Sequence, residues 1–121
     1  MNADGLQVRY KVWLERGGQV ALSDWRVQLL EEIDRHGSLA EAARHIGVPY
    51  KTAWYKLKEM EKSLGEALLT SASGGPKGGG ATLTDAGREA IRQYQQLIAG
   101  LDELLNARFA ETLGGRQKWP E

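Results

Sequence analysis

Residues 38–64 read SLAEAARHIGVPYKTAWYKLKEMEKSL. Ser38 is a good N-cap and Glu41 lies three residues later, so this capping box predicts that a short helix begins here. The turn Gly47-Val48-Pro49 ends that helix and leads into a second helix over residues 50–64. The inner face of the second helix carries apolar residues at helical spacing: Ala53, Leu57, Met60 and Leu64. Two helices joined by a short glycine turn predict a helix-turn-helix, whose second helix is suited to the major groove of DNA.

The segment before this stretch predicts a β-hairpin and one more helix. Residues 6–14, LQVRYKVWL, alternate between apolar and polar side chains, which is typical of a half-buried strand. The alternation resumes after Gly17-Gly18, so we expect a hairpin over residues 6–22. Ser23-Asp24 can then cap a helix that ends at Gly37.

The segment after it predicts a glycine-rich wing. Residues 67–70 and 81–84 are short strand candidates, and the loop between them, SASGGPKGGG, contains five glycines and Lys77. A phosphate-binding P-loop needs Ser or Thr after its Gly-Lys pair, whereas Lys77 follows proline and precedes glycine, which counts against nucleotide hydrolysis. We interpret the loop as a wing whose bare backbone and Lys77 lie along DNA; a surface loop without a role is the alternative.

Thr84-Asp85 begins the last predicted helix, which runs over residues 85–113. Its apolar positions step by three and four residues: Ile91, Tyr94, Ile98, Leu101, Leu105 and Phe109. Two roles compete for this stripe, namely packing on its own domain and pairing with the same helix of a second subunit. We favour a homodimer, because a helix of this length outruns the domain that precedes it. The tail over residues 114–121 is expected to be loose.

Together these elements predict a mainly α fold with a small β component: a winged helix-turn-helix with an N-terminal β-hairpin and a long C-terminal dimerisation helix. We expect a single domain over residues 1–121, with the winged core over residues 24–84.

Composition excludes several classes of function. The 121 residues include no cysteine and only two histidines, His36 and His45, so we expect no metal site and no cofactor. No apolar run reaches the roughly 20 residues of a membrane span, and the N-terminus lacks a secretory signal, so we expect a cytoplasmic protein without a membrane partner. No catalytic constellation is present, and we therefore expect no enzymatic activity.

The charge balance is 16 cations against 16 acids, which seems to disfavour a nucleic-acid partner. The distribution reverses this inference, because the stretch from Arg44 to Lys58 contains four cations and no acid. The expected partner is double-stranded DNA. The candidate DNA-binding residues are Arg44, Tyr50, Lys51, Thr52, Trp54, Tyr55, Lys58 and Lys77. Lysine-rich helix faces are often only solvated, and Trp54 is as well suited to packing against the core as to contacting DNA.

Two segments, GVPYKTAWYKLKEM at 47–60 and GGPKGGGATLT at 74–84, resemble the DNA-binding domain of the molybdate-responsive transcriptional regulators, the ModE family. More distantly, the chain is similar to the LysR-type helix-turn-helix. The resemblance covers roughly residues 6–110. It implies a dimeric protein on palindromic operator DNA, with contacts from Tyr50, Lys51, Thr52, Trp54, Tyr55 and, in the wing, Lys77.

The chain departs from the family in two respects. Full-length members carry oxyanion-binding domains for molybdate or tungstate, and the chain ends before any such domain, so we expect no molybdate site in it. Ser71 stands where the family often has arginine, so one contact to the DNA backbone is absent.

The resulting hypothesis is a sequence-specific transcriptional regulator that acts as a homodimer on a palindromic operator, with a link to molybdenum metabolism. One rival is a protein-interaction module that heterodimerises with a full-length regulator and modulates it. A second rival is a small enzyme or oxyanion carrier that uses the glycine loop.

Overall fold

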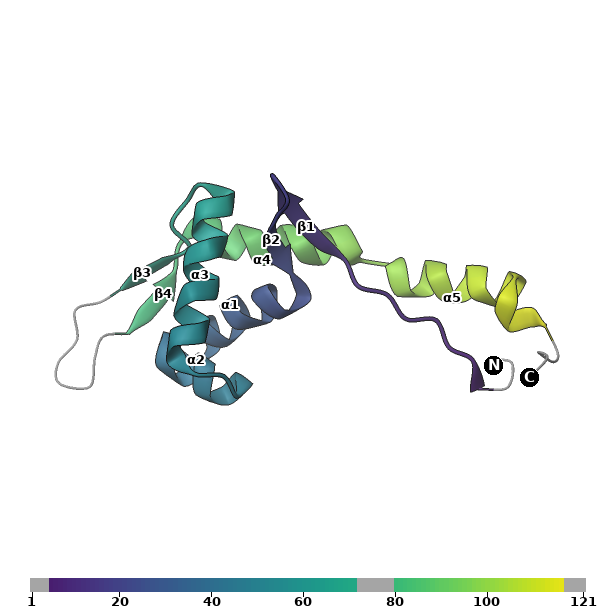
Figure 1. The fold of residues 1–121 in the computed structure, drawn as a ribbon, viewed down its shortest axis with the longest axis horizontal. Coiled ribbons are helices and arrows are strands. Elements are labelled where there is room, and N and C mark those ends of the chain that lie inside the picture. Colours follow the sequence, from purple (N-terminus) through teal and green to yellow (C-terminus); the bar gives the residue numbers. More distant parts are fainter. Residues whose placement is uncertain (1–4, 72–79, 117–121) are drawn as a thin grey trace. The chain divides into compact units, whose positions relative to one another are not determined.

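The computed structural model describes residues 5–71 and 80–116. The chain divides into two compact units (Figure 1). Val12–Gln95 form the first, which we call the winged unit, and Met1–Lys11 together with Gln96–Glu121 form the second, the terminal unit. Each unit is described by itself.

The winged unit begins with a short antiparallel hairpin of β1 (Trp13–Arg16) and β2 (Gln19–Ser23). Its turn is Gly17-Gly18, and both glycines have positive φ, 58° and 81°. The hairpin predicted over residues 6–22 is therefore correct only in its second half. Residues 6–12 form no strand, because β2 has just five residues before the chain turns into a helix and so offers them no partner.

Three helices follow at the expected places: α1 (Asp24–His36), α2 (Leu39–Ile46) and α3 (Tyr50–Leu64). The hydroxyl oxygens of Ser23 and Ser38 accept the N–H groups of Arg26 and Glu41, at 3.2 and 2.9 Å, and so cap α1 and α2. The capping-box prediction is half right, since the Glu41 carboxylate is bonded to Arg44. The fully buried core gathers large apolar side chains from α1, from α3 and from the segment that follows α3: Leu29, Leu30, Ile33, Met60 and Leu68.

The wing strands are β3 (Leu69–Ser71) and β4 (Ala81–Leu83), which pair antiparallel with Leu69 opposite Leu83. The loop that joins them, with Lys77, lies outside the described residues. Thr84 ends the wing and starts the next helix: its hydroxyl donates to Ala67 O at 2.7 Å and accepts the Gly87 N–H at 3.1 Å.

The long helix predicted over residues 85–113 is wrong as a single element. Two helices stand in its place, α4 (Asp85–Ile98) and α5 (Leu101–Glu111), followed by the 3-10 turn η2 (Leu113–Gly115). The break lies at Gly100, whose φ of 78° is left-handed and so interrupts the helical hydrogen-bond ladder. Gly100 O then accepts the Leu104 N–H at 3.0 Å and begins α5.

The expected dimerisation stripe also divides. Tyr94 on α4 is buried within its own chain, and its hydroxyl donates to Val12 O at 2.7 Å. It therefore fastens α4 to the start of the hairpin and is not open to a partner. The other five stripe residues are half-buried: Ile91, Ile98, Leu101, Leu105 and Phe109.

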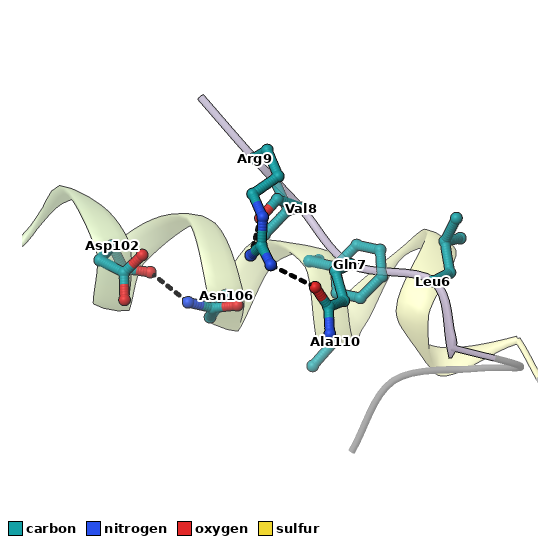
Figure 2. A pocket seen from close by; sticks show the side chains of 8 residues that line it. Leu6, Gln7, Val8, Arg9, Asp102, Asn106 and Ala110 are labelled. Carbon is teal, nitrogen blue, oxygen red and sulfur yellow. Dashed lines mark hydrogen bonds between the residues drawn. The ribbon is translucent and has the colours of Figure 1, made fainter. Parts of the chain in front are cut away.

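In the terminal unit, the extended residues Leu6–Arg9 run along α5 (Figure 2). Leu6 and Val8 share a shallow pocket with Phe109 and Ala110 of the helix. No residue of α5 is fully buried, and Leu104 and Leu113 are about half exposed, at 47% and 53%. Across residues 5–71 and 80–116, no helix combines the length and hydrophobicity that crossing a membrane requires.

Candidate nucleic-acid interface

The turn between α2 and α3 sets the direction of α3. Gly47 adopts φ 91°, and the N–H groups of Gly47 and Val48 both donate to Ala43 O, at 2.9 and 3.0 Å. Small side chains, Ala43 on α2 and Ala53 on α3, are buried close to this turn. The helices can therefore pack closely, and the opposite face of α3 points outward.

Six of the eight candidate DNA-binding residues lie on α3, and five of them are exposed. Ala53, Leu57 and Met60 point into the core and are 3% exposed or less. Thr52 is half-buried. The exposed set consists of Tyr50, Lys51, Trp54, Tyr55 and Lys58.

Four of the exposed side chains form one cluster, which we call the aromatic–lysine cluster: Lys51, Trp54, Tyr55 and Lys58. The rings of Trp54 and Tyr55 meet edge to face with centroids 5.2 Å apart. The Lys58 ammonium lies 5.5 Å from the Trp54 ring, and the Lys51 ammonium lies 5.9 Å from the Tyr55 ring. Trp54 is thus a surface residue, 39% exposed, and not part of the core.

The N-terminus of α3 is open. Its N-cap is Pro49, which makes no side-chain hydrogen bond to the helix, and its first turn contains no acid. The first N–H groups of a helix lack partners within the helix, and the helix dipole adds partial positive charge at this end. The end of α3 that carries Tyr50 and Lys51 is therefore suited to an anion such as a phosphate.

A groove separates this face of α3 from the wing. Tyr50, Trp54 and Lys58 line one side, and Ser71 of β3 with Gly80 and Ala81 before and within β4 line the other. Arg44 and the first turn of α2 also line it. Figure 1 shows α3 beside the β3–β4 ribbon.

The charge on this face is smaller than the sequence suggests. Three of the four cations between residues 44 and 58 pair with carboxylates three positions away: Arg44–Glu41 at 2.8 Å, Lys56–Glu59 at 3.6 Å and Lys58–Glu61 at 3.2 Å. A count over the linear stretch omits these acids because they lie just beyond its ends. Lys51 is the one cation of the four without a carboxylate partner among residues 5–71 and 80–116.

Two carboxylates that sequence reasoning missed hold α3 in place. Glu59 pairs at 2.9 Å with Arg26, which is buried on α1 and also reaches Lys56 O. The hydrogen bond from Arg26 lowers the pKa of Glu59 below its ordinary value of 4.5, with help from Lys56 and against the effect of burial. Glu61 accepts the N–H of Leu68 at 2.8 Å and so ties α3 to the chain that enters the wing. The sequence offers only a weak signal for the Arg26–Glu59 contact, namely that Arg26 is a charged residue among apolar neighbours.

A second cluster of titratable side chains lies at the ends of α1 and α2, and none of its members lines the groove. It consists of Glu32, His36 and His45, and it is the one group in the described part of the chain whose ligand atoms could hold a metal ion. Burial raises the pKa of Glu32. The charges of Arg35 and His45 and the hydrogen bond from His36 outweigh this effect, so the pKa lies below its usual value.

Sequence comparison matches residues 26–88 to a family described as bacterial regulatory helix-turn-helix protein, lysR family. Among similar proteins, the molybdenum-pterin-binding protein MopB of Rhodobacter capsulatus is 43% identical over 96 residues, which are 79% of this chain and 35% of that protein. The molybdenum transport protein ModE of Azotobacter vinelandii is 40% identical over 99 residues, 78% of this chain and 36% of that protein.

The DNA-binding transcriptional dual regulator ModE of Escherichia coli is 39% identical over 72 residues, 60% of this chain and 28% of that protein. The chain thus spans about a third of the length of the curated relatives it matches. These matches confirm the resemblance to the ModE DNA-binding domain that the recognition-helix and wing segments indicated.

Solved structures share the fold. CbnR in complex with its target DNA superposes with a TM-score of 0.56 at 19% identity, over 71% of this chain and 28% of CbnR. LysG from Corynebacterium glutamicum gives a TM-score of 0.53 at 23% identity, over 72% of this chain and 29% of LysG. The predicted fold class, a mainly α winged helix-turn-helix, is confirmed.

Proposed function

The chain belongs to the lysR family of bacterial regulatory helix-turn-helix proteins, and from this premise we propose that it regulates transcription by binding specific double-stranded DNA. Helix α3 enters the major groove, and the wing follows the adjacent DNA backbone. The activity is binding and not catalysis, and it takes place where bacterial chromosomal DNA lies, in the cytoplasm.

The aromatic–lysine cluster beside the open N-terminus of α3 is the observation that carries this proposal. Lys51, at the exposed start of the helix, donates to guanine O6 and N7, and Thr52 contacts a base edge or a thymine methyl group. Tyr50, Trp54 and Tyr55 supply flat apolar surface between the cations. The groove between this face and the wing admits a DNA backbone.

Arg44 and Lys58 serve as phosphate contacts in this proposal. Both are already paired with carboxylates, and Lys58 is half exposed beside the more buried Glu61. The Arg44–Glu41 pair is exposed on both sides, and such pairs contribute only about 0–1 kcal/mol. Exchanging the Glu41 carboxylate for a phosphate therefore costs little. Lys77 in the wing is assigned to the DNA backbone on its sequence context alone, and binding there releases about one counterion.

The proposed active form is a homodimer on a palindromic operator. Helix α5 has eleven residues and buries none of them, although it carries Leu101, Leu104, Leu105 and Phe109. A helix shorter than about 12–15 residues is marginal in water without packing. Residues 6–9 line only part of α5, so we propose that the helix gains a further partner surface. The same helix of a second copy supplies one by two-fold symmetry, and two-fold symmetry in the protein favours a palindromic site.

A link to molybdenum metabolism is the finer part of the proposal. It is supported by the names of the relatives, which include a molybdenum transport protein and a molybdenum-pterin-binding protein. Promoters of genes for molybdenum uptake and use in the source organism are accordingly the first candidates for operator sites.

Fluorescence anisotropy with labelled DNA tests the proposal. The chain is titrated into promoter fragments and into shuffled sequences of equal composition at about 150 mM salt, and we expect preference for one or more promoters. Trp54→Ala should weaken this binding about tenfold or more, since buried aromatic anchors dominate interfaces. Trp13→Ala is the matched control, because Trp13 is also exposed, at 51%, but lies on β1. Equal affinity for all fragments, or equal loss in both variants, contradicts the proposal.

The unburied apolar face of α5 also favours a second candidate, in which the chain pairs with a full-length relative and modulates it. Mixing the chain with such a regulator and measuring mass by light scattering separates the two. A mixed dimer that forms while the chain alone stays monomeric and binds no DNA supports this second function.

A further inference from the structure

The strongest feature outside the DNA-facing surface is the cluster of Glu32, His36 and His45. Glu32 and His36 lie one turn apart on α1, and His45 comes from the last turn of α2. Oε1 of Glu32 lies 3.0 Å from Nε2 of His36 and 2.7 Å from Nδ1 of His45. The three ligand atoms all lie within 4.8 Å of one another.

These donor atoms suit a particular class of cation. Imidazole nitrogen with carboxylate oxygen is a ligand set for Zn²⁺ and other late first-row divalent ions, whereas Mg²⁺ and Ca²⁺ prefer oxygen alone. Ligand atoms bound to one zinc at about 2.0–2.1 Å are about 3.3 Å apart in tetrahedral geometry. The Glu32–His36 and Glu32–His45 spacings of 3.0 and 2.7 Å must open by about 0.3 and 0.6 Å to reach this value, and the two histidine nitrogens lie within 4.8 Å of each other. The exposed His45 side chain can make that adjustment.

The surroundings also favour a cation. His36 and His45 both lie in the last turn of a helix, where the negative end of the helix dipole stabilises positive charge. The Glu32 side chain is only 10% exposed, while the His36 and His45 side chains are 31% and 59% exposed. The carboxylate is therefore held within the fold, and water can reach the two histidines. Arg35 binds the second oxygen of Glu32, which leaves Oε1 as a single ligand.

We propose that Glu32, His36 and His45 bind one late first-row divalent ion, Zn²⁺ in the first instance, and that the ion ties the end of α1 to the end of α2. Water completes the coordination, since only three protein ligands are present. Because α2 sets the direction of α3 through the Gly47 turn, the bound ion restricts the movement of α2 and therefore of the recognition helix α3. This site shares no residue with the proposed DNA contacts, so a test of the metal site does not decide whether the chain binds DNA.

Calorimetry on the tag-free full chain, stripped with EDTA and desalted, tests the site directly. Titration with ZnCl₂ should give one ion per chain, and the Tm of the chain should rise with Zn²⁺ and saturate, while MgCl₂ at the same concentration should leave it unchanged. Co²⁺ should produce visible absorption bands of a nitrogen- and oxygen-ligated ion. No binding, or an equal response to Mg²⁺, overturns the proposal.

Variants then assign the ligands. His45→Gln should weaken Zn²⁺ binding at least about tenfold, since the loss of even a supporting partner of a metal ligand commonly costs that much. His45 is largely exposed, so this variant should fold, and a circular dichroism spectrum checks it. Asp34→Asn is the matched control, because Asp34 is an exposed carboxylate on α1 outside the cluster. Unchanged Zn²⁺ affinity in His45→Gln, or equal loss in Asp34→Asn, shows that the ion binds elsewhere.

Discussion

Lys51 differs from the other cations between residues 44 and 58. It has no carboxylate partner among the described residues, and it stands at the open end of α3. A cation without a local ion pair has no such pair to break when it moves from water to the edge of a base, so binding costs it the least free energy. On this reasoning, Lys51 is the residue whose removal most affects the choice of sequence.

Lys51→Ala should weaken binding to the specific site by about 1–3 kcal/mol, which is the usual contribution of a good contact to a base edge. Lys62→Ala is the matched control, because it removes the same charge from the other end of the same helix. Anisotropy titrations of both variants check the prediction. Similar losses in the two variants would mean that Lys51 contributes only net charge.

The contact between Glu59 and Arg26 should make the stability of the fold depend on pH. The pKa of Glu59 is lowered in the folded chain, mainly by the hydrogen bond from Arg26, so the contact stabilises the fold above the ordinary pKa of 4.5. That stabilisation is lost as the pH falls through the lowered pKa. Glu59 is 55% exposed on its side chain, so solvent screening keeps the effect modest.

Urea unfolding of the parent and of Glu59→Gln should therefore differ above about pH 5 and converge in acid. The exposed residue Glu66 offers a control in Glu66→Gln. A difference between Glu59→Gln and the parent that grows as the pH falls would contradict the assigned role of Arg26.

At the scale of elements, local signals in the sequence predicted most of the winged unit. Serine caps and terminal glycines mark the ends of α1 and α2, and the apolar spacing of α3 identified its inner face correctly. These features depend on neighbours within a few residues. The exposed face of α3 followed directly, and with it the candidate DNA-binding residues.

The elements that were predicted wrongly depend on partners that spacing does not reveal. Residues 6–12 alternate like a strand but have no strand to pair with. Gly100 sits in an otherwise helical pattern, and only its left-handed conformation shows that the helix stops there. The Arg26–Glu59 and Glu32–His45 contacts join residues far apart in the sequence, so no local pattern indicates them.

Gly87 lies where α4 passes very close to Leu68, the residue before the wing strand β3, so its substitution should change the stability of the fold. A Cβ atom at Gly87 would lie 2.5 Å from the Leu68 carbonyl oxygen, and a backbone atom cannot swing aside. Gly87→Ala should therefore lower the free energy of unfolding by about 1–3 kcal/mol, although alanine favours helices. Denaturant titration measures this change. A gain in stability would show that α4 can move away from the wing.

At the scale of the whole molecule, zero net charge has a physical consequence for the proposed function. The cations near α3 are largely paired, so attraction to arbitrary DNA is modest. In the proposed function, selectivity then comes from the contacts of α3 and from the pairing of two subunits on two half-sites. On this proposal, we expect tight binding to require the dimer.

Leu105→Glu places a charge on the apolar side of α5 and should convert the dimer to a monomer. Operator affinity should fall with it, because each half-site then binds alone. Ala107→Glu is the control, since it adds the same charge about half a turn away on an exposed position of α5. Light scattering after size-exclusion chromatography measures the mass. A dimer that survives Leu105→Glu would place the subunit contact elsewhere.

Selection of bound sequences from a random DNA library with the purified chain tests the central claim most directly. We predict that it enriches a palindromic site whose two halves are about 34 Å, one helical turn, apart, as two copies of α3 in successive major grooves require. Recovery of sequences with no common motif, or of a single half-site without symmetry, would contradict the account.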